Sequence, residues 1–163
     1  MCTSNCWLRT GALLAGLAVA AGAFAAHGLD RPLFEKYADQ TYEKKVNGTV
    51  VSQVPLAQKY LADFKTGAEY QMYHGLALLA VGLLAQVRTS RMLTIAGICF
   101  AAGCVGFSGG LYAYALTGTK WIGQFIVPAG GILYLAGWIA FVASACPCRR
   151  QSASSTSPTA TSS

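Results

Sequence analysis

Four long stretches of the chain contain no Lys, Arg, Asp or Glu, and apolar residues dominate each of them. They are Thr10–Leu29, Tyr70–Val87, Met92–Thr119 and Trp121–Cys148. A helix of roughly 20 apolar residues crosses a bilayer core about 30 Å thick, so each stretch is long enough to span a membrane. The pattern predicts an all-α membrane protein. We expect a bundle of four transmembrane helices, at about 10–29, 69–87, 92–116 and 122–145, with one polar loop insertion (30–68) between the first two.

The first apolar stretch also fits a secretory signal peptide. Arg9 precedes it, and Ala23-Phe24-Ala25 offers a cleavage site of small residues. However, one positive charge is few for such a signal, and the apolar run continues past the cleavage site to Leu29. We therefore expect the first helix to be retained, and three further spans follow under either interpretation.

The polar segment contains two local signals. Its Asn47-Gly48 dipeptide is flanked by β-branched residues and favours the type I′ turn of a two-residue hairpin, because both positions accept a positive φ. After Pro55, apolar residues recur near helical spacing at Leu56, Tyr60 and Phe64. This spacing predicts a short amphipathic helix that lies on the membrane surface or caps the bundle.

Composition supports a single membrane domain. Apolar residues make up 54% of the chain and charged residues 11%, against roughly 25% charged in soluble domains. We expect one domain, 1–148, and a disordered Ser/Thr-rich tail, 149–163. The net charge of +6 comes from Lys and Arg spread over loops and ends, so it does not indicate nucleic-acid binding. The expected partner is the lipid bilayer.

Glycine is frequent inside the apolar stretches, and the chain contains 18 glycines. In lipid, small residues let helix backbones approach closely, and Gly106 and Gly110 form a GxxxG pair of this kind. The glycine-rich faces predict tight contacts within the bundle. They also suit contacts with a second copy of the chain, as a homo-oligomer, or with other membrane proteins.

Four crossings put both chain ends on one side of the membrane. That side carries Arg9, Arg88 and Arg91 with no acidic residue beside them. A count of Lys and Arg alone slightly favours the opposite side as cytoplasmic, but Arg9 directly before the first span favours its own end. We expect cytoplasmic N- and C-termini in a bacterial inner membrane.

Polar residues gather in one half of the predicted bundle. The tripeptide His-Gly-Leu occurs at the end of the first predicted span and near the start of the second. Antiparallel helices would bring both imidazoles to the same side of the membrane and to a similar level. The candidate polar cluster consists of His27, Glu69, Gln71, His74, Ser108, Tyr112 and Gln124.

Two kinds of interpretation fit this cluster. A buried hydrogen-bonded network that fixes helix register is the one we favour, since polar side chains in lipid pair with one another. Two histidines on facing helices could also ligate a haem or metal, or relay protons. A metal site normally has three or four ligands, and abundant Gly and Ala favour close helix contact over a haem slot. The sequence therefore predicts no catalytic residue, no cofactor and no metal site.

The positions of the cysteines do not indicate a specific function either. Cys2, Cys6, Cys146 and Cys148 are expected at one face, where zinc binding or lipidation is conceivable. Their spacings match no strong zinc-finger pattern, so we expect unpaired thiols. The remaining pair, Cys99 and Cys104, fits small packing residues inside the third helix.

A family resemblance covers residues 10 to about 143. The chain resembles the transmembrane protein 256-like family, whose bacterial members are catalogued as domain of unknown function 423. The resemblance implies small four-helix inner-membrane proteins without an established activity, and it supplies no catalytic residue. Two parts depart from the family pattern, an insertion at roughly 39–55 and the Ser/Thr tail. The resembling motifs are Gly22–Leu29, Phe64–Leu79, Phe107–Tyr112, Leu116–Gly118, Pro128–Gly131 and Gly137-Trp138.

These features together predict a non-enzymatic structural or accessory membrane subunit. A small transporter or channel, with its polar site at His27, Gln71, His74 and Gln124, is the first alternative. No mid-membrane charge supports it, although coupled transport usually requires one. A haem- or quinone-binding redox subunit is the second alternative.

Overall fold

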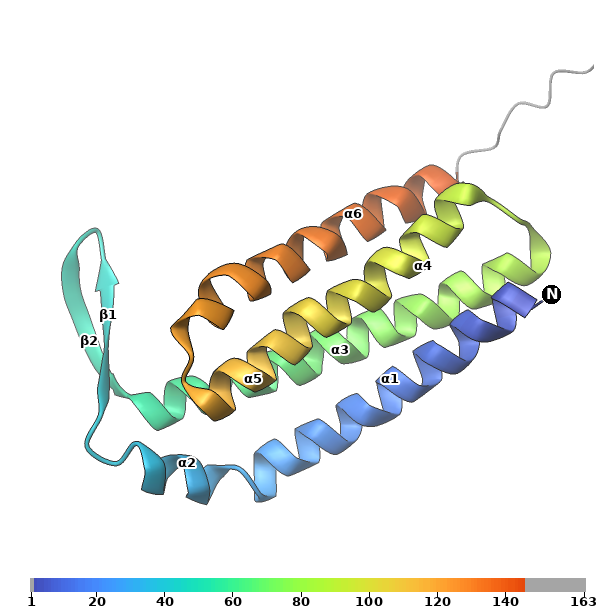
Figure 1. Ribbon diagram of the computed structural model, residues 1–163. Helices are drawn as coiled ribbons and strands as arrows, with labels where there is room; N and C mark the ends of the chain where they lie inside the picture. Colours follow the sequence, from blue (N-terminus) through green and yellow to red (C-terminus); the bar gives the residue numbers. More distant parts are fainter. Residues whose placement is uncertain (1, 146–163) are drawn as a thin grey trace, which may run out of the picture.

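The computed structural model describes residues 2–145, apart from the side chains of residues 2–3 and 44–46. The predicted tail, Cys146 and Cys148 lie outside the described residues. Two wider π-helical turns, η1 (Cys104–Gly109) and η2 (Ile122–Ile126), run directly into the helices that follow them. The helices are α1 (Cys2–His27), α2 (Asp30–Lys36), α3 (Leu56–Val87), α4 (Arg91–Gly103), α5 (Gly110–Thr117) and α6 (Val127–Ala145), and the strands are β1 (Thr41–Val46) and β2 (Thr49–Pro55) (Figure 1).

The described part of the chain is mostly helical, and three of its helical segments are long and apolar enough to cross a membrane. They are Ser4–His27, Arg91–Thr117 and Ile122–Ala145. The second segment joins α4, η1 and α5, and the third joins η2 and α6. The π-helical turn in η2 precedes Pro128, which has no N–H to donate to the carbonyl of Gln124.

The structure corrects the prediction of a polar loop at 30–68. This region contains α2, a β-hairpin and the first turns of α3. The helix expected at 69–87 begins at Leu56, so the short amphipathic helix and the second predicted span are one continuous helix of 32 residues. The helix continues because its first turns bury apolar side chains, among them Tyr60 and Phe64, and no proline interrupts it.

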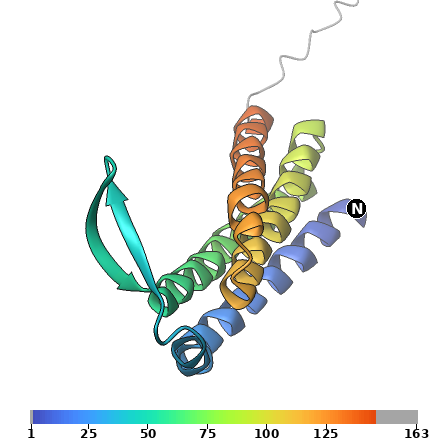
Figure 2. The same ribbon diagram turned by 60° about the vertical axis from the view of Figure 1, so that its left-hand side comes forward.

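The predicted hairpin is confirmed. Strands β1 and β2 pair antiparallel, and the turn residues Asn47 and Gly48 have φ values of 51° and 81°. Positive φ at both turn positions is what a type I′ turn requires. The hairpin projects away from the helices (Figure 2), and in β2 only Val54 is partly buried.

Helices α1 and α3 lie side by side and run antiparallel, touching at glycines. A Cβ atom on Gly11 would lie 2.7 Å from the carbonyl oxygen of Gly75, and one on Gly75 would lie 3.0 Å from the backbone nitrogen of Ala15. Nearer the start of α1, Leu8 contacts Gly82 in the same manner. On its other side, α3 contacts α4, η1 and α5, and α6 packs on α4 and η1. Helix α1 is therefore at one edge of the helical layer, against α3.

Helix α6 crosses η1 at Gly130. A Cβ atom at this position would contact the backbone nitrogen of Phe107 and lie 2.6 Å from the carbonyl carbon of Gly106. A Cβ on Gly110 would lie 3.1 Å from Val127 at the start of α6. The GxxxG pair therefore faces another helix of the same chain, as close backbone approach in lipid requires.

Two buried clusters form the core. One lies between α3, α4, η1 and α6 and is built around Leu78, Val81, Leu93 and Phe100. The other lies at the end where the hairpin projects and joins the end of α1 to α2, α3 and α5. Tyr60 and Phe64 of α3 belong to the second cluster, which explains why the polar segment folds against the helices.

Candidate functional site

His74 is the centre of a buried polar and aromatic cluster between α3, η1 and α6. Its side chain is 5% exposed. Its Nδ1 lies 2.8 Å from the carbonyl oxygen of Tyr70, and its Nε2 lies 3.2 Å from the indole Nε1 of Trp138. An indole N–H can only donate, so Nε2 accepts and the ring proton lies on Nδ1, which donates to Tyr70. These contacts select the neutral Nδ1–H tautomer of His74.

Tyr134 of α6 connects His74 to Ser108. The Tyr134 and His74 rings stack with centroids 3.4 Å apart and planes 10° apart. The Tyr134 hydroxyl lies 3.2 Å from Oγ of Ser108, which is completely buried. Because Ser108 belongs to η1, this set of contacts joins three helical segments.

Gln71 makes a second set of contacts, between α1, α3 and α5. Its Nε2 donates to the carbonyl oxygen of Leu14 at 2.9 Å, and its Oε1 accepts from the Tyr112 hydroxyl at 3.0 Å. Both ends of the amide are therefore bonded, which a buried amide needs if its desolvation is to be offset.

The structure brings some of the predicted cluster together and separates the rest. Gln71 bonds to Tyr112, and Tyr134 bridges His74 and Ser108. The side chains of the remaining members, His27, Glu69 and Gln124, are exposed and belong to neither set of contacts.

The prediction that the imidazoles of His27 and His74 lie at a similar level is wrong. Gly75, next to His74, contacts Gly11 and Ala15 of α1. His27 is further along α1 from Ala15 by about 18 Å, at the helical rise per residue. The reason is the early start of α3, which puts His74 in the middle of a long helix and not near its beginning.

Sequence reasoning did not single out Tyr134 and Trp138, although both contact His74. A signal was present: the two residues are four apart in an apolar helix and therefore share a face. A buried Tyr O–H or Trp N–H needs a hydrogen-bond partner, so this face should have been matched to polar residues on another helix.

The chemistry open to the cluster follows from its bonding. Both nitrogens of His74 and both polar atoms of Gln71 are engaged with other helices or with their own backbone. Among the residues that the structure describes, three or more His, Cys, Asp or Glu do not come together as a candidate metal site. The arrangement is suited to holding helices in register.

A separate cavity of about 870 Å³ lies beside the second core cluster. We call it the lysine–tyrosine pocket, after the lysines and tyrosines in its lining. Gln124 and Asp63 line it as well. The lysines and tyrosines that line it are Lys36, Tyr37, Tyr42, Lys59, Tyr60, Tyr114 and Lys120.

Lys59 is the most enclosed charge of this pocket. Its Nζ donates to Asp63 at 2.7 Å and to the Tyr114 hydroxyl at 3.2 Å, and it lies 4.8–5.4 Å from the ring centroids of Tyr42, Tyr60 and Tyr114. Burial lowers the pKa of the ammonium, but the two hydrogen bonds and the attraction of Asp63 and Tyr114 outweigh it and raise the pKa. Burial, with the neighbouring Tyr114, raises the pKa of Tyr60.

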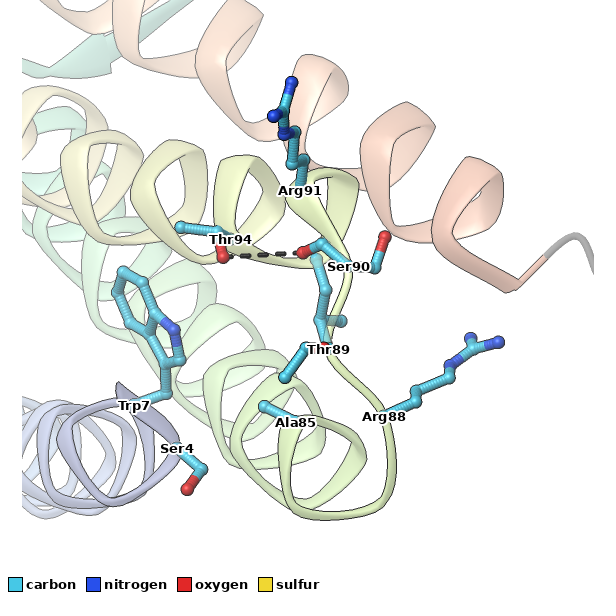
Figure 3. Close-up of a pocket in the computed structure, with 9 residues that line it drawn as sticks. Ser4, Trp7, Ala85, Arg88, Thr89, Ser90, Arg91 and Thr94 are labelled. Carbon is cyan, nitrogen blue, oxygen red and sulfur yellow. Dashed lines mark hydrogen bonds between the residues drawn. The ribbon is translucent and has the colours of Figure 1, made fainter. Parts of the chain in front are cut away.

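A smaller cavity of about 360 Å³ lies at the opposite end, where α3 turns into α4. Trp7, Thr89 and Thr94 line it, and Thr94 donates to the carbonyl oxygen of Ser90. In Figure 3 the guanidinium group of Arg88 points away from Trp7 and Ala85. Arg91 also lines the cavity, and its guanidinium group points in another direction than that of Arg88, so the two groups do not converge on one point.

Comparison with known proteins places the chain in a family. The sequence profile described as "Protein of unknown function (DUF423)" matches residues 21–131, which is more than half of the chain. The chain belongs to this family. The finding confirms the resemblance seen in the sequence.

Its relatives are named as membrane proteins. A UPF0382 membrane protein of Staphylococcus saprophyticus is 37% identical over 81% of this chain and 89% of its own length. The UPF0382 membrane protein YwdK of Bacillus subtilis is 36% identical over 83% of this chain and 91% of its own length, and a UPF0382 membrane protein of Haemophilus influenzae is 36% identical over 83% and 89%. No solved structure matches significantly. Together with the three apolar helices of spanning length in this chain, these relatives show that the chain is a membrane protein of the DUF423 family.

Proposed function

We propose that this protein is a non-enzymatic structural or accessory subunit of the bacterial inner membrane. The observation that carries the proposal is the bonding of His74 and Gln71. Their side chains bond to Trp138, Tyr112 and Leu14 of other helices, as in a network that fixes helix positions. A catalytic or transport site would instead turn such groups toward a cavity.

In this proposal α3 is a fourth membrane span. Its charge-free stretch, Tyr70–Val87, lies along α1, as the contacts of Gly75 with Ala15 and of Gly82 with Leu8 indicate. If α1 crosses the bilayer, this stretch lies at the same depth. Gln71 and His74 lower its hydropathy, but both are buried, so they do not present polar atoms to lipid.

The proposed surface for a second copy or another membrane protein is the outer face of α1. Most helical glycines already face another segment of the same chain, whereas a Cβ on Gly16 would meet nothing within 4 Å. Leu13, Leu17 and Val19 on the same helix are exposed. Small residues among exposed apolar ones allow a further helix to approach.

Native mass spectrometry of the full chain, extracted from membranes in mild detergent, tests this role. We expect a dimer, a higher oligomer, or a complex with a membrane protein in fixed stoichiometry. Gly16→Leu should dissociate it and leave a folded monomer, because the added side chain points away from the other helices. Gly97 faces the ring of Trp7, so Gly97→Ala is the interior control and should lower the melting temperature. A monomer without a stoichiometric partner contradicts the proposal.

An absorbance spectrum of the same sample separates the redox alternative. A Soret band or a bound quinone would replace the structural role with a redox one. The transporter alternative has one observation in its favour, the cavity of about 870 Å³ that Gln124 lines. Solute flux into liposomes that contain the protein, abolished by substitutions at that cavity, would favour transport.

Cytoplasmic N- and C-termini are also part of the proposal. Cys6, near the start of α1, is exposed, and Ser52 lies on the exposed hairpin near the opposite end. In intact cells, a membrane-impermeant thiol reagent should label a Ser52→Cys variant and should not label Cys6. The reverse pattern would invert the orientation.

A further inference from the structure

The lysine–tyrosine pocket lies at the level where the candidate spans end. Those spans end at His27 and Thr117 and begin again at Ile122 on this side. The pocket is lined by residues next to two of these ends, including Thr117, Lys120 and Gly123. A ligand held there would therefore lie near the boundary between lipid and water, where lipid headgroups also lie.

Positive charge dominates the lining. Lys36, Lys59 and Lys120 face the cavity together with a single carboxylate, Asp63. That carboxylate is already paired with Lys59 at 2.7 Å. The net charge of the described lining is therefore positive, and an anion would be attracted to it.

The tyrosine rings favour the same sign of ligand. Rings arranged in this way could bind an external cation through their faces. Here the Nζ of Lys59 already occupies that position, about 5 Å from the rings of Tyr42, Tyr60 and Tyr114. An external cation would meet a like charge, whereas an anion would meet an ammonium and phenolic O–H donors.

Two helix ends meet at the pocket, and the negative one is already compensated. The last turn of α5 presents carbonyl groups, and Lys36 donates to the carbonyl oxygen of Leu116 at 2.9 Å. The first turn of the helical segment that begins at η2 contributes Gly123 and Gln124, so the positive end of its dipole also faces the cavity. The helix dipole therefore adds to the charge of the lysines.

We propose that the lysine–tyrosine pocket binds a phosphate group, carried by an anionic phospholipid headgroup or by a small soluble phosphate. Lysine ammonium groups act as point charges for phosphate oxygens, and hydroxyl groups donate to them. A volume of about 870 Å³ accommodates such a ligand. The inference is independent of the structural role proposed above, because it concerns a different region of the molecule.

Calorimetric titration of the full chain in a neutral detergent tests the site with two soluble probes, inorganic phosphate and glycerol 1-phosphate. A second arm uses nanodiscs of phosphatidylcholine with and without phosphatidylglycerol, and native mass spectrometry counts the retained anionic lipids. We expect at least one probe to bind saturably. Lys120→Gln should raise its Kd about tenfold, the loss of one charge-assisted hydrogen bond. Binding of lipid alone assigns a headgroup as the ligand, and binding of a soluble probe assigns a free phosphate.

Lys65→Gln is the matched control. Lys65 is an exposed lysine of α3 that does not line the pocket, so its removal changes net charge equally and should leave the Kd unchanged. Lys36→Gln provides a second test and should weaken binding as Lys120→Gln does. The proposal is overturned if neither soluble probe binds saturably and phosphatidylglycerol is retained no more than phosphatidylcholine. It is also overturned if Lys65→Gln weakens binding as much as Lys120→Gln.

Discussion

In the middle of the molecule, Gln71, His74 and Ser108 bond to residues of neighbouring helices, whereas at the hairpin end Lys36, Lys59 and Lys120 surround a cavity. The difference follows from the surroundings of each region. Polar atoms among apolar helices must find partners inside the protein, since an unpaired buried group costs free energy. At the end of the spans water and headgroups can solvate the charges. Polar groups there remain able to bind something else.

The largest expected effect belongs to the crossing at Gly130. Gly130→Ala places a methyl group against the backbone of Gly106 and Phe107, so the helices must separate. We expect the free energy of unfolding to fall by about 3 kcal/mol, measured by denaturation in detergent. Gly16→Ala adds the same methyl group where nothing lies within 4 Å and should change stability by less than about 1 kcal/mol. Equal losses would show that the middle of the molecule is not tightly packed.

Removal of His74 should have the next largest effect. His74→Leu leaves the Trp138 N–H, in a partly buried hydrogen bond, without its partner, at a cost of about 1–3 kcal/mol. His27→Leu, at an exposed position, should cost almost nothing. Adding Trp138→Phe to His74→Leu should restore part of the loss, because the unpaired donor is then removed as well. Chemical denaturation of the four proteins checks this, and equal losses for His27 and His74 would contradict it.

The Gln71–Tyr112 bond should contribute less. A double-mutant cycle with Gln71→Met and Tyr112→Phe should give a coupling of about 0.6–1.5 kcal/mol, as found for hydrogen bonds between membrane helices. Strictly additive losses would mean that the two side chains act separately. The same cycle between Glu69 and Tyr112 should give no coupling, since Glu69 is exposed.

The smallest effect concerns pH at the lysine–tyrosine pocket. The pKa of Lys59 is raised above 10.5, so its charged contacts stabilise the fold at lower pH, and this contribution is lost as pH rises through the raised value. The raised pKa of Tyr60 acts in the same direction. Lys59 is faced by Asp63, Tyr42 and Tyr114 as well.

We therefore expect the melting temperature to be constant from neutral pH to about pH 9 and to fall above about pH 10.5. Lys59→Met should reduce the alkaline fall, and Tyr60→Phe should reduce it further. Lys65→Met, outside the pocket, should leave the profile unchanged. A profile that is identical in all four proteins would show that these contacts do not stabilise the folded state.

Local signals in the sequence were sufficient where neighbouring residues decide the structure. The Asn47-Gly48 hairpin follows from two residues that accept a positive φ, and the apolar stretches specify helices of spanning length. A helix after Pro55 was predicted, but its continuity with the span expected at 69–87 was missed, so α3 was divided into two elements. Residues 56–68 are more polar than the stretch that follows, and the packing of Tyr60 and Phe64 against α2 and α5 gives the two parts one continuous axis.

The sequence by itself determined the membrane class, the family, the helical content and the residue types available for a polar cluster. Only the tertiary structure decided which of those residues meet. His27 and His74 share a motif but lie at different depths, and Tyr134 and Trp138 reach His74 from a helix far along the chain. The physical reason is that hydropathy and periodicity depend on neighbours in sequence. The depth and rotation of one helix against another depend instead on contacts such as those at Gly75 and Gly130.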